Sequence, residues 1–308
     1  MEMKRPDRLE KGDRIAIISP ATVVKEEYVR GAEKMLRECG YEAEIFPAAL
    51  GPASGTYAAK LEARVSDLRQ ALTDPGIKGI LCARGGYGCV HLLSEIPVEL
   101  VSKNPKWMMG FSDVSALHAL WEKGGVMSIH SPMAKHLTIE GATDDYTRML
   151  LSILEGEKPE YESAPHPFNR EGVGEGTLRG GNLAVLNGLA DTPYDILKVM
   201  DGEEVILFIE DISEAVYAVE RMLMRLVLSG SLRKLKGLIV GRFTDYKEDR
   251  NHGTMERMID NLLHRHGIEG FPVAFNFPVG HVKENYPLVE GSRVRLEVGP
   301  KGVVLREV

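Results

Sequence analysis

The stretch K-W-M-M-G-F-S-D-V-S-A-L-H-A-L, from Lys106 to Leu120, changes from a strand pattern to a helix pattern at a serine. Trp107–Met109 is a short apolar run typical of a buried strand, and Gly110 ends it. Beyond the turn, the apolar residues that recur at helical spacing are Val114, Leu117 and Leu120. The sequence therefore predicts a strand, a tight turn at Ser112 and a helix.

This turn has two interpretations. A serine on a tight strand-to-helix turn exposes its hydroxyl beside the unpaired N–H groups of a helix N-terminus, which suits a nucleophile and the oxyanion it creates. Alternatively, Ser112 is a helix N-cap and Asp113 a favourable first-turn acid. On the local pattern alone the cap is the commoner of the two, and the residues leave both open.

Similar units surround this turn in the first half of the chain. Expected strands are Arg14–Ser19, Glu42–Pro47, Gly79–Ala83 and Met127–His130, and expected helices are Glu26–Cys39 and Ala58–Leu72. Strands that alternate with amphipathic helices indicate right-handed βαβ units. We therefore expect residues 1–154 to form an α/β domain around a parallel sheet.

The pattern weakens in residues 155–176, which are rich in Gly, Pro, Glu and His and are expected to be a linker. Residues 177–308 are expected to form a second, smaller α/β domain. Its expected strands are Glu204–Glu210, Leu238–Val240 and Val273–Phe277, its helices Ala215–Leu228 and Met255–His264, and its closing antiparallel hairpin Glu290–Val298 with Gly302–Arg306.

Composition excludes several classes of function. The 308 residues carry a formal charge of -7 with no cluster of Lys and Arg, so nucleic acid is not an expected partner. No apolar run approaches the ~20 residues that span a bilayer, and the charged start lacks a secretory signal. The cysteines Cys39, Cys82 and Cys89 form no C-x-x-C pair, so we expect a cytoplasmic protein without disulfides or a thiolate metal site. No metal or cofactor is expected, because the chain has no H-E-x-x-H pattern and its R-G-G-Y-G stretch is not a nucleotide-binding motif.

Strand ends carry the candidate chemistry. R-G-G-Y-G, Arg84–Gly88, follows an expected strand and is either an anion-holding loop or a plain turn. His130 and His281 both follow strands, and the pattern does not choose between them as a base, whereas His118 is expected to be a packed core residue. Glu210 and Asp211 end an apolar strand, as functional carboxylates or as a helix-capping pair before Ser213.

Several motifs, in order along the chain, give it a resemblance to a known family. They are A-R-G-G-Y-G at Ala83, G-F-S-D at Gly110, H-S-P-M at His130, R-G-G-N-L at Arg179, F-I-E-D at Phe208 and P-V-G-H at Pro278. The ordered set resembles the LD-carboxypeptidases, serine peptidases that trim the cytoplasmic murein tetrapeptide. The expected fold is thus α/β, with an N-terminal flavodoxin- or glutamine-amidotransferase-like domain and a smaller C-terminal α/β domain with an antiparallel element.

The resemblance implies a triad of Ser112, Glu210 and His281, with the nucleophile in the first domain and the other two residues in the second. The expected reaction is acyl transfer to water, in which His281 is the base and Glu210 orients it. The N–H groups of Gly86 and Asp113 would face the oxyanion. The expected substrate is a small murein peptide that ends in D-alanine. Its candidate binding residues are Arg84, by position at the strand end, and Asn182, in the R-G-G-N-L motif.

Two stretches depart from the family pattern, and two other functions stay open. Val282 follows His281 where many relatives have a smaller residue, and Tyr286–Gly291 (Y-P-L-V-E-G) differs from the usual L-P-x-G. One alternative is a microcin-immunity-like hydrolase of another aminoacyl or peptidyl conjugate. The other is a non-catalytic two-domain ligand-binding protein. The sequence also leaves the oligomeric state open, with a homodimer as one alternative.

Overall fold

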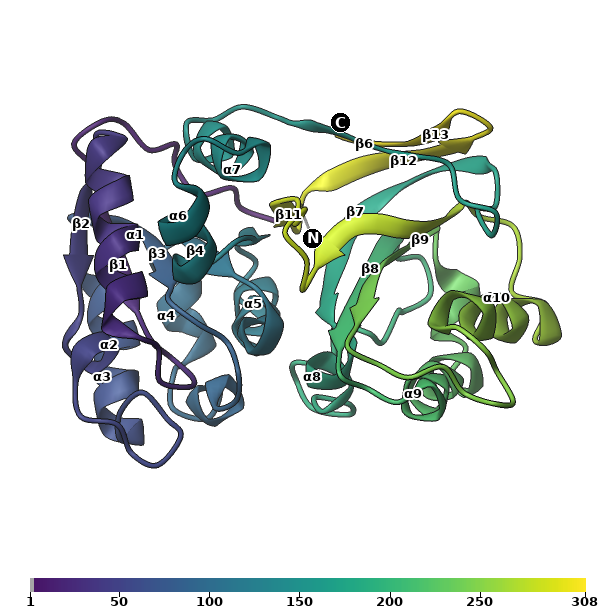
Figure 1. The fold of residues 1–308 in the computed structure, drawn as a ribbon, viewed down its shortest axis with the longest axis horizontal. Coiled ribbons are helices and arrows are strands. Elements are labelled where there is room, and N and C mark those ends of the chain that lie inside the picture. The colour runs from purple at the N-terminus through teal and green to yellow at the C-terminus, as the bar shows by residue number, and fades with distance from the viewer. Residues whose placement is uncertain (1–2) are drawn as a thin grey trace. The chain divides into compact units, whose positions relative to one another are not determined.

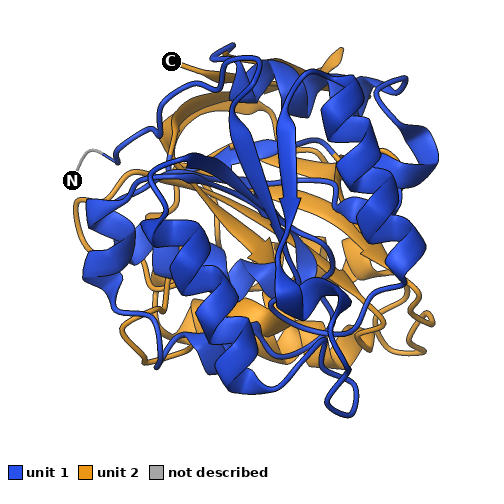
Figure 2. Ribbon diagram, turned by 90° about the vertical axis from the view of Figure 1, so that its left-hand side faces the viewer, with its two compact units in different colours: residues 1–157, 286–291 blue, residues 158–285, 292–308 orange. Residues whose placement is uncertain are grey.

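A computed structural model describes residues 3–308 and divides the chain into two compact units. Unit 1 holds the chain up to Glu157 together with Tyr286–Gly291, and unit 2 holds Lys158–Asn285 and Ser292–Val308 (Figure 2). Each unit contains its own β-sheet. The fold is α/β, as the sequence predicts.

Unit 1 is built on a six-stranded sheet in the order β11-β5-β4-β3-β1-β2. The strands are β1 (Arg14–Ile18), β2 (Glu42–Ile45), β3 (Ile77–Cys82), β4 (Trp107–Gly110), β5 (Ser128–His130) and β11 (Leu288–Glu290). The first five are parallel, and β11 joins β5 in antiparallel register. The order 2-1-3-4-5 is that of flavodoxin-like sheets, in which ligands gather outside the carboxyl ends of the strands.

Helices cover both faces of this sheet. They are α1 (Glu26–Glu38), α2 (Pro47–Leu50), α3 (Leu61–Thr73), α4 (Val98–Lys103), α5 (Ser115–Lys123), α6 (Ala134–Glu140) and α7 (Asp145–Leu154), with the short 3₁₀ helices η1 (Cys89–Leu92) and η2 (Ser112–Val114). One core joins the apolar stripes of α1, α6 and α7 to the sheet, and Figure 1 shows α1 beside α6. Helices α3 and α5 pack against the central strands as well. Both faces of the central strands are buried, which explains their continuous apolar sequences.

Strand β11 corrects the expected C-terminal hairpin. Glu290 was expected at the start of that hairpin, but it ends β11 in the sheet of unit 1, where it pairs with Ser128. Val289 is buried in the core shared with α1 and α7. The run Leu288–Glu290 is buried throughout, and the turn at Gly291, with φ +85, separates it from the hairpin that follows.

Unit 2 contains a curled, mixed sheet in the order β10-β9-β8-β7-β12-β13-β6. Its strands are β6 (Glu160–Ser163), β7 (Gly172–Asn182), β8 (Val205–Ile212), β9 (Gly237–Thr244), β10 (Val273–Gly280), β12 (Arg293–Gly299) and β13 (Gly302–Glu307). The run β7 to β10 is parallel, whereas β12, β13 and β6 are antiparallel, which confirms the expected antiparallel element. Helices α8 (Leu183–Asn187), α9 (Val216–Leu228) and α10 (Met255–Arg265) lie along one side of it (Figure 1), and η3 (Ser231–Lys234) follows α9.

Residues 155–176, expected to be a linker, contain the regular strand β6 and the start of β7. The sequence pattern did not indicate the start of β7 because this segment is rich in glycine, which weakens a strand and usually marks close backbone approach. A Cβ at Gly174 would lie 1.9 Å from the Lys236 carbonyl oxygen, and one at Gly180 would lie 2.0 Å from that of Phe208. The glycines therefore let neighbouring backbone pack against β7.

Candidate active site

Ser112 is the first residue of η2, two positions beyond the end of β4. Its φ is 65°, a left-handed value that costs about 1–2 kcal/mol for a residue with a Cβ. An N-cap residue has extended dihedrals instead, and that position belongs to Phe111, with φ -150°. Ser112 is therefore a strained turn residue and not the cap. This conformation is the one expected of a nucleophile on a strand-to-helix turn.

The glycine-rich loop after β3 packs directly against this turn. A Cβ at Gly85 would lie 2.9 Å from Ser112 Cβ and 3.0 Å from Ser112 Oγ. Farther along the loop, the Cys89 N–H donates a 2.8 Å hydrogen bond to Asp113 Oδ2. Asp113 is 3 % exposed, and burial raises the pKa of its carboxyl. The Asp113 side chain thus ties the loop to η2, a role that its sequence position did not reveal.

The two proposed oxyanion donors are the N–H groups of Gly86 and Asp113, which directly follow Gly85 and Ser112 in the chain. A Cβ at Gly85 would also lie 3.1 Å from the Asp113 nitrogen, so that N–H belongs to the same small region. Gly86 has φ +105°, and a Cβ there would lie 2.2 Å from Thr22 Oγ1. Among residues 3–308 the Gly86 N–H has no hydrogen-bond partner. Only glycine fits at this position, and its N–H remains able to bind an oxyanion.

Arg84 begins the same loop, and its side chain is exposed. Its guanidinium donates a 2.7 Å hydrogen bond to the Val23 carbonyl oxygen, which holds it beside the loop that follows β1. A single backbone contact leaves several of the five N–H donors of an arginine for a carboxylate. Arg84 stays a prediction as the residue that binds the substrate carboxylate.

In unit 2, Glu210 and His281 form a hydrogen-bonded pair. His281 Nδ1 lies 2.8 Å from Glu210 Oε2. The Glu210 side chain is fully buried, whereas His281 is 16 % exposed. Burial alone would lower the pKa of His281, but the hydrogen bond to Glu210 and the charges of Glu210, Asp211 and Asp245 raise it above its ordinary value. The carboxylate therefore orients the ring and stabilises its charged form.

Local backbone irregularities produce this pair. Sequence reasoning ended the strand at Glu210, but β8 continues to Ile212 and its register with β9 shifts between Ile209 and Asp211. Such a bulge re-aims a side chain. His281 directly follows β10, where a Cβ at Gly280 would lie 2.8 Å from Glu210 Oε2. The glycine of the P-V-G-H motif thus makes room for the carboxylate.

Polar residues next to the Glu210–His281 pair support it, and one of them, Asn285, was not predicted from the sequence. Asp211 accepts hydrogen bonds from the Ala184 N–H and from Asn182 Nδ2, so it supports the start of α8 and does not cap a helix before Ser213. Asn182 is 4 % exposed and also accepts from the Val185 N–H, which gives it a structural role; substrate binding by Asn182 stays a prediction. Asn285, which no sequence signal indicated, accepts the Gly280 N–H at 2.9 Å.

The remaining candidate histidines lie inside unit 1. His130 ends β5, is fully buried, and packs its ring 5.6 Å from that of Phe111. His118 is buried in α5, as expected of a core residue, although both ring nitrogens make polar contacts. His281, the other strand-end histidine, has the Glu210 carboxylate at hydrogen-bond distance. This geometry favours His281 as the base.

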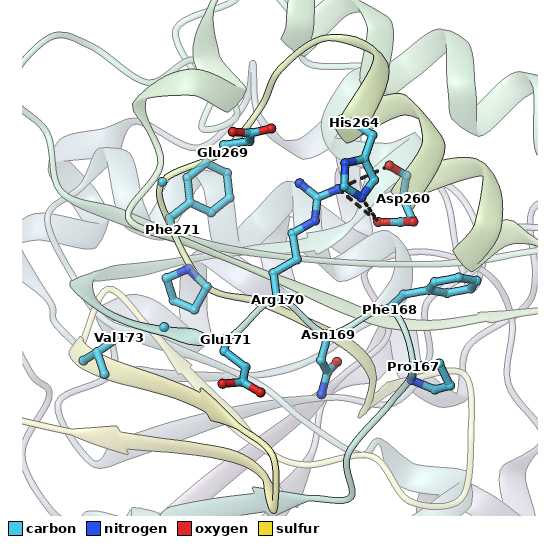
Figure 3. Close-up of a pocket in the computed structure, with 13 residues that line it drawn as sticks. Pro167, Phe168, Asn169, Arg170, Glu171, Val173, Asp260, His264, Glu269 and Phe271 are labelled. Carbon is cyan, nitrogen blue, oxygen red and sulfur yellow. Dashed lines mark hydrogen bonds and ion pairs between the residues drawn. The ribbon is translucent and has the colours of Figure 1, made fainter.

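A cavity of about 440 Å³ lies elsewhere in unit 2 (Figure 3). It opens near Pro272, before β10, whereas His281 follows the other end of that strand. Figure 3 shows the Arg170 guanidinium directed at Asp260, to which it donates a 2.9 Å hydrogen bond. None of the residues predicted for the site lines this cavity.

The described part of the chain holds neither a candidate metal site nor a helix that could span a membrane. Within residues 3–308, no group of three or more His, Cys, Asp and Glu side chains could hold a metal ion. In the same part of the chain, no helix has the length and apolar character needed to cross a membrane. The three cysteines are unpaired, and Cys82 and Cys89 are buried.

Comparison with known proteins agrees with these features. Residues 15–131 match the family model described as the LD-carboxypeptidase N-terminal domain, and residues 175–296 match its C-terminal domain. A putative carboxypeptidase of Synechocystis is 34 % identical over 95 % of this chain and 94 % of its own length. The crystal structure of muramoyltetrapeptide carboxypeptidase from Oxalobacter formigenes superposes with a TM-score of 0.84 at 30 % identity, covering 96 % of this chain and 98 % of that one.

A second group of solved structures shares the fold. MccF, a microcin C7 self immunity protein, has been solved in complex with glutamyl sulfamoyl guanosine. It superposes with a TM-score of 0.84 over 100 % of this chain and 99 % of its own, at 20 % identity. At that identity the likeness concerns the fold alone.

Proposed function

Since this chain belongs to the LD-carboxypeptidase family, we propose that it is a serine carboxypeptidase that releases the terminal D-alanine of the murein tetrapeptide. The bond cleaved joins the L-centre of a diamino acid to D-alanine. Its hydrolysis is a reaction of cytoplasmic peptidoglycan recycling. The observation that carries the proposal is the strained turn at Ser112, φ 65°, packed against a glycine loop with an unpaired N–H. The Glu210–His281 pair supplies the matching base.

In the proposed mechanism, Ser112 from unit 1 acts with Glu210 and His281 from unit 2. His281 Nε2 takes the Ser112 proton as Oγ attacks the carbonyl carbon of the scissile bond. Glu210 holds Nδ1–H, which fixes the tautomer and stabilises the imidazolium. The negative oxygen of the tetrahedral intermediate is bound by the N–H groups of Gly86 and Asp113.

The intermediate then collapses with loss of D-alanine, whose amine takes the proton from His281. The acyl group remains on Ser112 Oγ as an ester. Water, deprotonated by His281, attacks this ester to form a second oxyanion. The bond between the acyl carbon and Ser112 Oγ then breaks, Oγ takes the proton back from His281, and the shortened peptide leaves. Arg84 is proposed to bind the terminal carboxylate that marks a carboxypeptidase substrate.

The decisive assay incubates the protein with murein tetrapeptide and measures released D-alanine. We expect release by the native protein, and none above a small residual rate by Ser112→Ala, which should keep the fold because only a hydroxyl is lost. Native-like release by the Ser112→Ala protein contradicts the assignment of the nucleophile. Absence of release by the native protein contradicts the substrate.

A microcin-immunity-like hydrolase is the second candidate, supported by the fold that the chain shares with MccF. This candidate predicts cleavage of an aminoacyl sulfamoyl nucleoside in the same assay. Faster turnover of that conjugate than of the tetrapeptide favours it. Specific binding of either compound without turnover favours the non-catalytic alternative.

A further inference from the structure

Beneath the Ser112 turn lies a buried polar cluster formed by His118, Ser128 and Glu290. His118 lies in α5, Ser128 begins β5, and Glu290 ends β11, all within unit 1. Each of these residues is at most 3 % exposed. Buried polar groups destabilise a fold unless they are satisfied, so a cluster beneath a strained turn requires a physical explanation.

His118 bridges two elements through both ring nitrogens. Nε2 lies 2.8 Å from the Gly110 carbonyl oxygen, and Nδ1 lies 2.8 Å from Ser128 Oγ. A carbonyl oxygen only accepts, so Nε2 carries the proton, and in the neutral ring Nδ1 accepts from the serine hydroxyl. Burial lowers the pKa of His118 to about 4, against the smaller effect of its bond to Gly110, so the ring is neutral at pH 7.

Glu290 is compatible with this neutral ring. Its Oε1 lies 3.8 Å from His118 Nε2. Burial, with the nearby charge of Glu122, raises the pKa of Glu290 well above its ordinary range, which favours the protonated carboxyl. An ionised carboxylate at that distance would favour the imidazolium, which could no longer accept from Ser128.

The bond to Gly110 acts where the strained turn begins. Gly110 lies two residues before Ser112, and its carbonyl also accepts the Ser131 N–H at 3.0 Å. A residue with a positive φ and a Cβ keeps that conformation only when its surroundings over-determine it. His118 anchors the carbonyl that precedes the turn, and it lies on the helix that follows the turn.

We propose that His118 is a positioning residue, which holds Ser112 in its strained, attacking conformation through the Gly110 carbonyl, and that Glu290 fills the buried space beside the His118 ring. This inference rests on the proposed role of Ser112 as the nucleophile. It adds a function for a residue that sequence reasoning assigned to the core, and one for Tyr286–Gly291, the segment that departs from the family pattern.

The test compares His118→Leu with His118→Gln in the full chain, using release of D-alanine. His118→Leu keeps the volume and removes the donor, so we expect kcat to fall about tenfold to a hundredfold while KM stays unchanged. His118→Gln retains a donor for the Gly110 carbonyl and should recover most of kcat. The rate of labelling by a fluorophosphonate, which reacts with activated serines, should follow kcat in both variants.

Leu150→Ala is the matched control for lost stability, because Leu150 is a buried core residue of α7 in the same unit. It should lower the free energy of unfolding without changing kcat. A native kcat in His118→Leu, or an equal loss of kcat in Leu150→Ala, overturns the proposal. Glu290→Gln should stay active, since glutamine keeps the shape of the side chain beside His118, and an inactive, folded Glu290→Gln overturns the role of Glu290.

These outcomes are separable from the failure of the proposed function. If Ser112→Ala retains activity, the nucleophile is wrong and the positioning role falls with it. If Ser112→Ala is inactive and His118→Leu is fully active, only the positioning role is wrong.

Discussion

At the scale of single residues, the pKa of His281 determines the pH dependence of the proposed reaction. A general base must be neutral, so activity should rise with pH through that pKa. Although burial lowers the pKa of His281, Glu210 raises it above the ordinary 6.5. In a plot of kcat/KM against pH, the midpoint of the rise on the acid side should therefore lie above pH 6.5. In Glu210→Gln the burial remains while the hydrogen bond to a carboxylate and its charge are lost. We therefore expect the midpoint of kcat/KM to move to lower pH and kcat to fall by roughly 10³–10⁴.

The control for this profile is Glu220→Gln. Glu220 lies 3.4 Å from His252 Nε2 in the same unit, and neither residue belongs to the proposed triad. Its profile should match that of the native protein. An acid limb that stays in place in Glu210→Gln would show that another group controls the rate.

A second prediction at this scale concerns the effect of a side chain at Gly280 on kcat. Gly280→Ala introduces a Cβ 2.8 Å from Glu210 Oε2 at a φ of +125°, so the carboxylate must move away from His281. We expect kcat to fall at least about tenfold, because small displacements of catalytic groups are costly. Gly230→Ala is the matched control, since Gly230 has φ +77° with no atom within 4 Å of the new Cβ. It should cost about 1–2 kcal/mol of stability and no activity. Equal activity losses in the two variants would contradict the steric explanation.

At the scale of elements, the contact between Asp113 and the Cys89 N–H joins the glycine loop to η2. Asp113→Ala should cost about 1–3 kcal/mol by leaving that N–H unpaired, and it should lower kcat about tenfold by loosening the loop that carries Gly86. Asp67→Ala provides a matched pair, because buried Asp67 accepts the Ala48 N–H at 2.8 Å in the same unit. Chemical denaturation should show a similar loss of unfolding free energy in the two variants, whereas only Asp113→Ala should lose activity. A fully active Asp113→Ala would remove the loop contact from the mechanism.

The elements that sequence reasoning predicted are those with strong periodicity or long apolar runs. Strands β1 and β8 and helices α1 and α9 fall within one or two residues of their expected bounds. Strand β7 was missed in part because its glycines serve backbone contacts, which leave no side-chain pattern. The turn at Ser112 was found, but its left-handed φ is a property of three-dimensional packing and distinguishes the strained turn from an N-cap only in the structure.

At the scale of the whole molecule, the path of the chain could not be predicted from pattern alone. The sequence predicted a single crossing between the two domains, through a linker at residues 155–176. The chain instead passes between the units three times, after Glu157, after Asn285 and after Gly291. Short buried strands such as β11 match many sheet edges equally well, so local pattern does not determine which sheet they join. The partners of Glu210 and Gly280 depend on the same long-range pairing, and only the motif resemblance indicated the histidine.

Substrate stereochemistry provides the last prediction. Attack requires the carbonyl carbon near Ser112 Oγ while its oxygen points at the N–H groups of Gly86 and Asp113. Inverting the leaving residue exchanges the places of its methyl and carboxylate, so the carboxylate loses its cationic partner, which we propose to be Arg84. An unpaired buried polar group costs roughly 1–3 kcal/mol, a tenfold to hundredfold loss of rate. We therefore expect kcat/KM for a tetrapeptide ending in D-alanine to exceed that for the L-alanine form by at least this factor. The pentapeptide with an extra D-alanine should also be a poor substrate, because its carboxylate lies one residue too far from the scissile bond. Equal values for the D- and L-terminated peptides would indicate a general acyl hydrolase on the same fold.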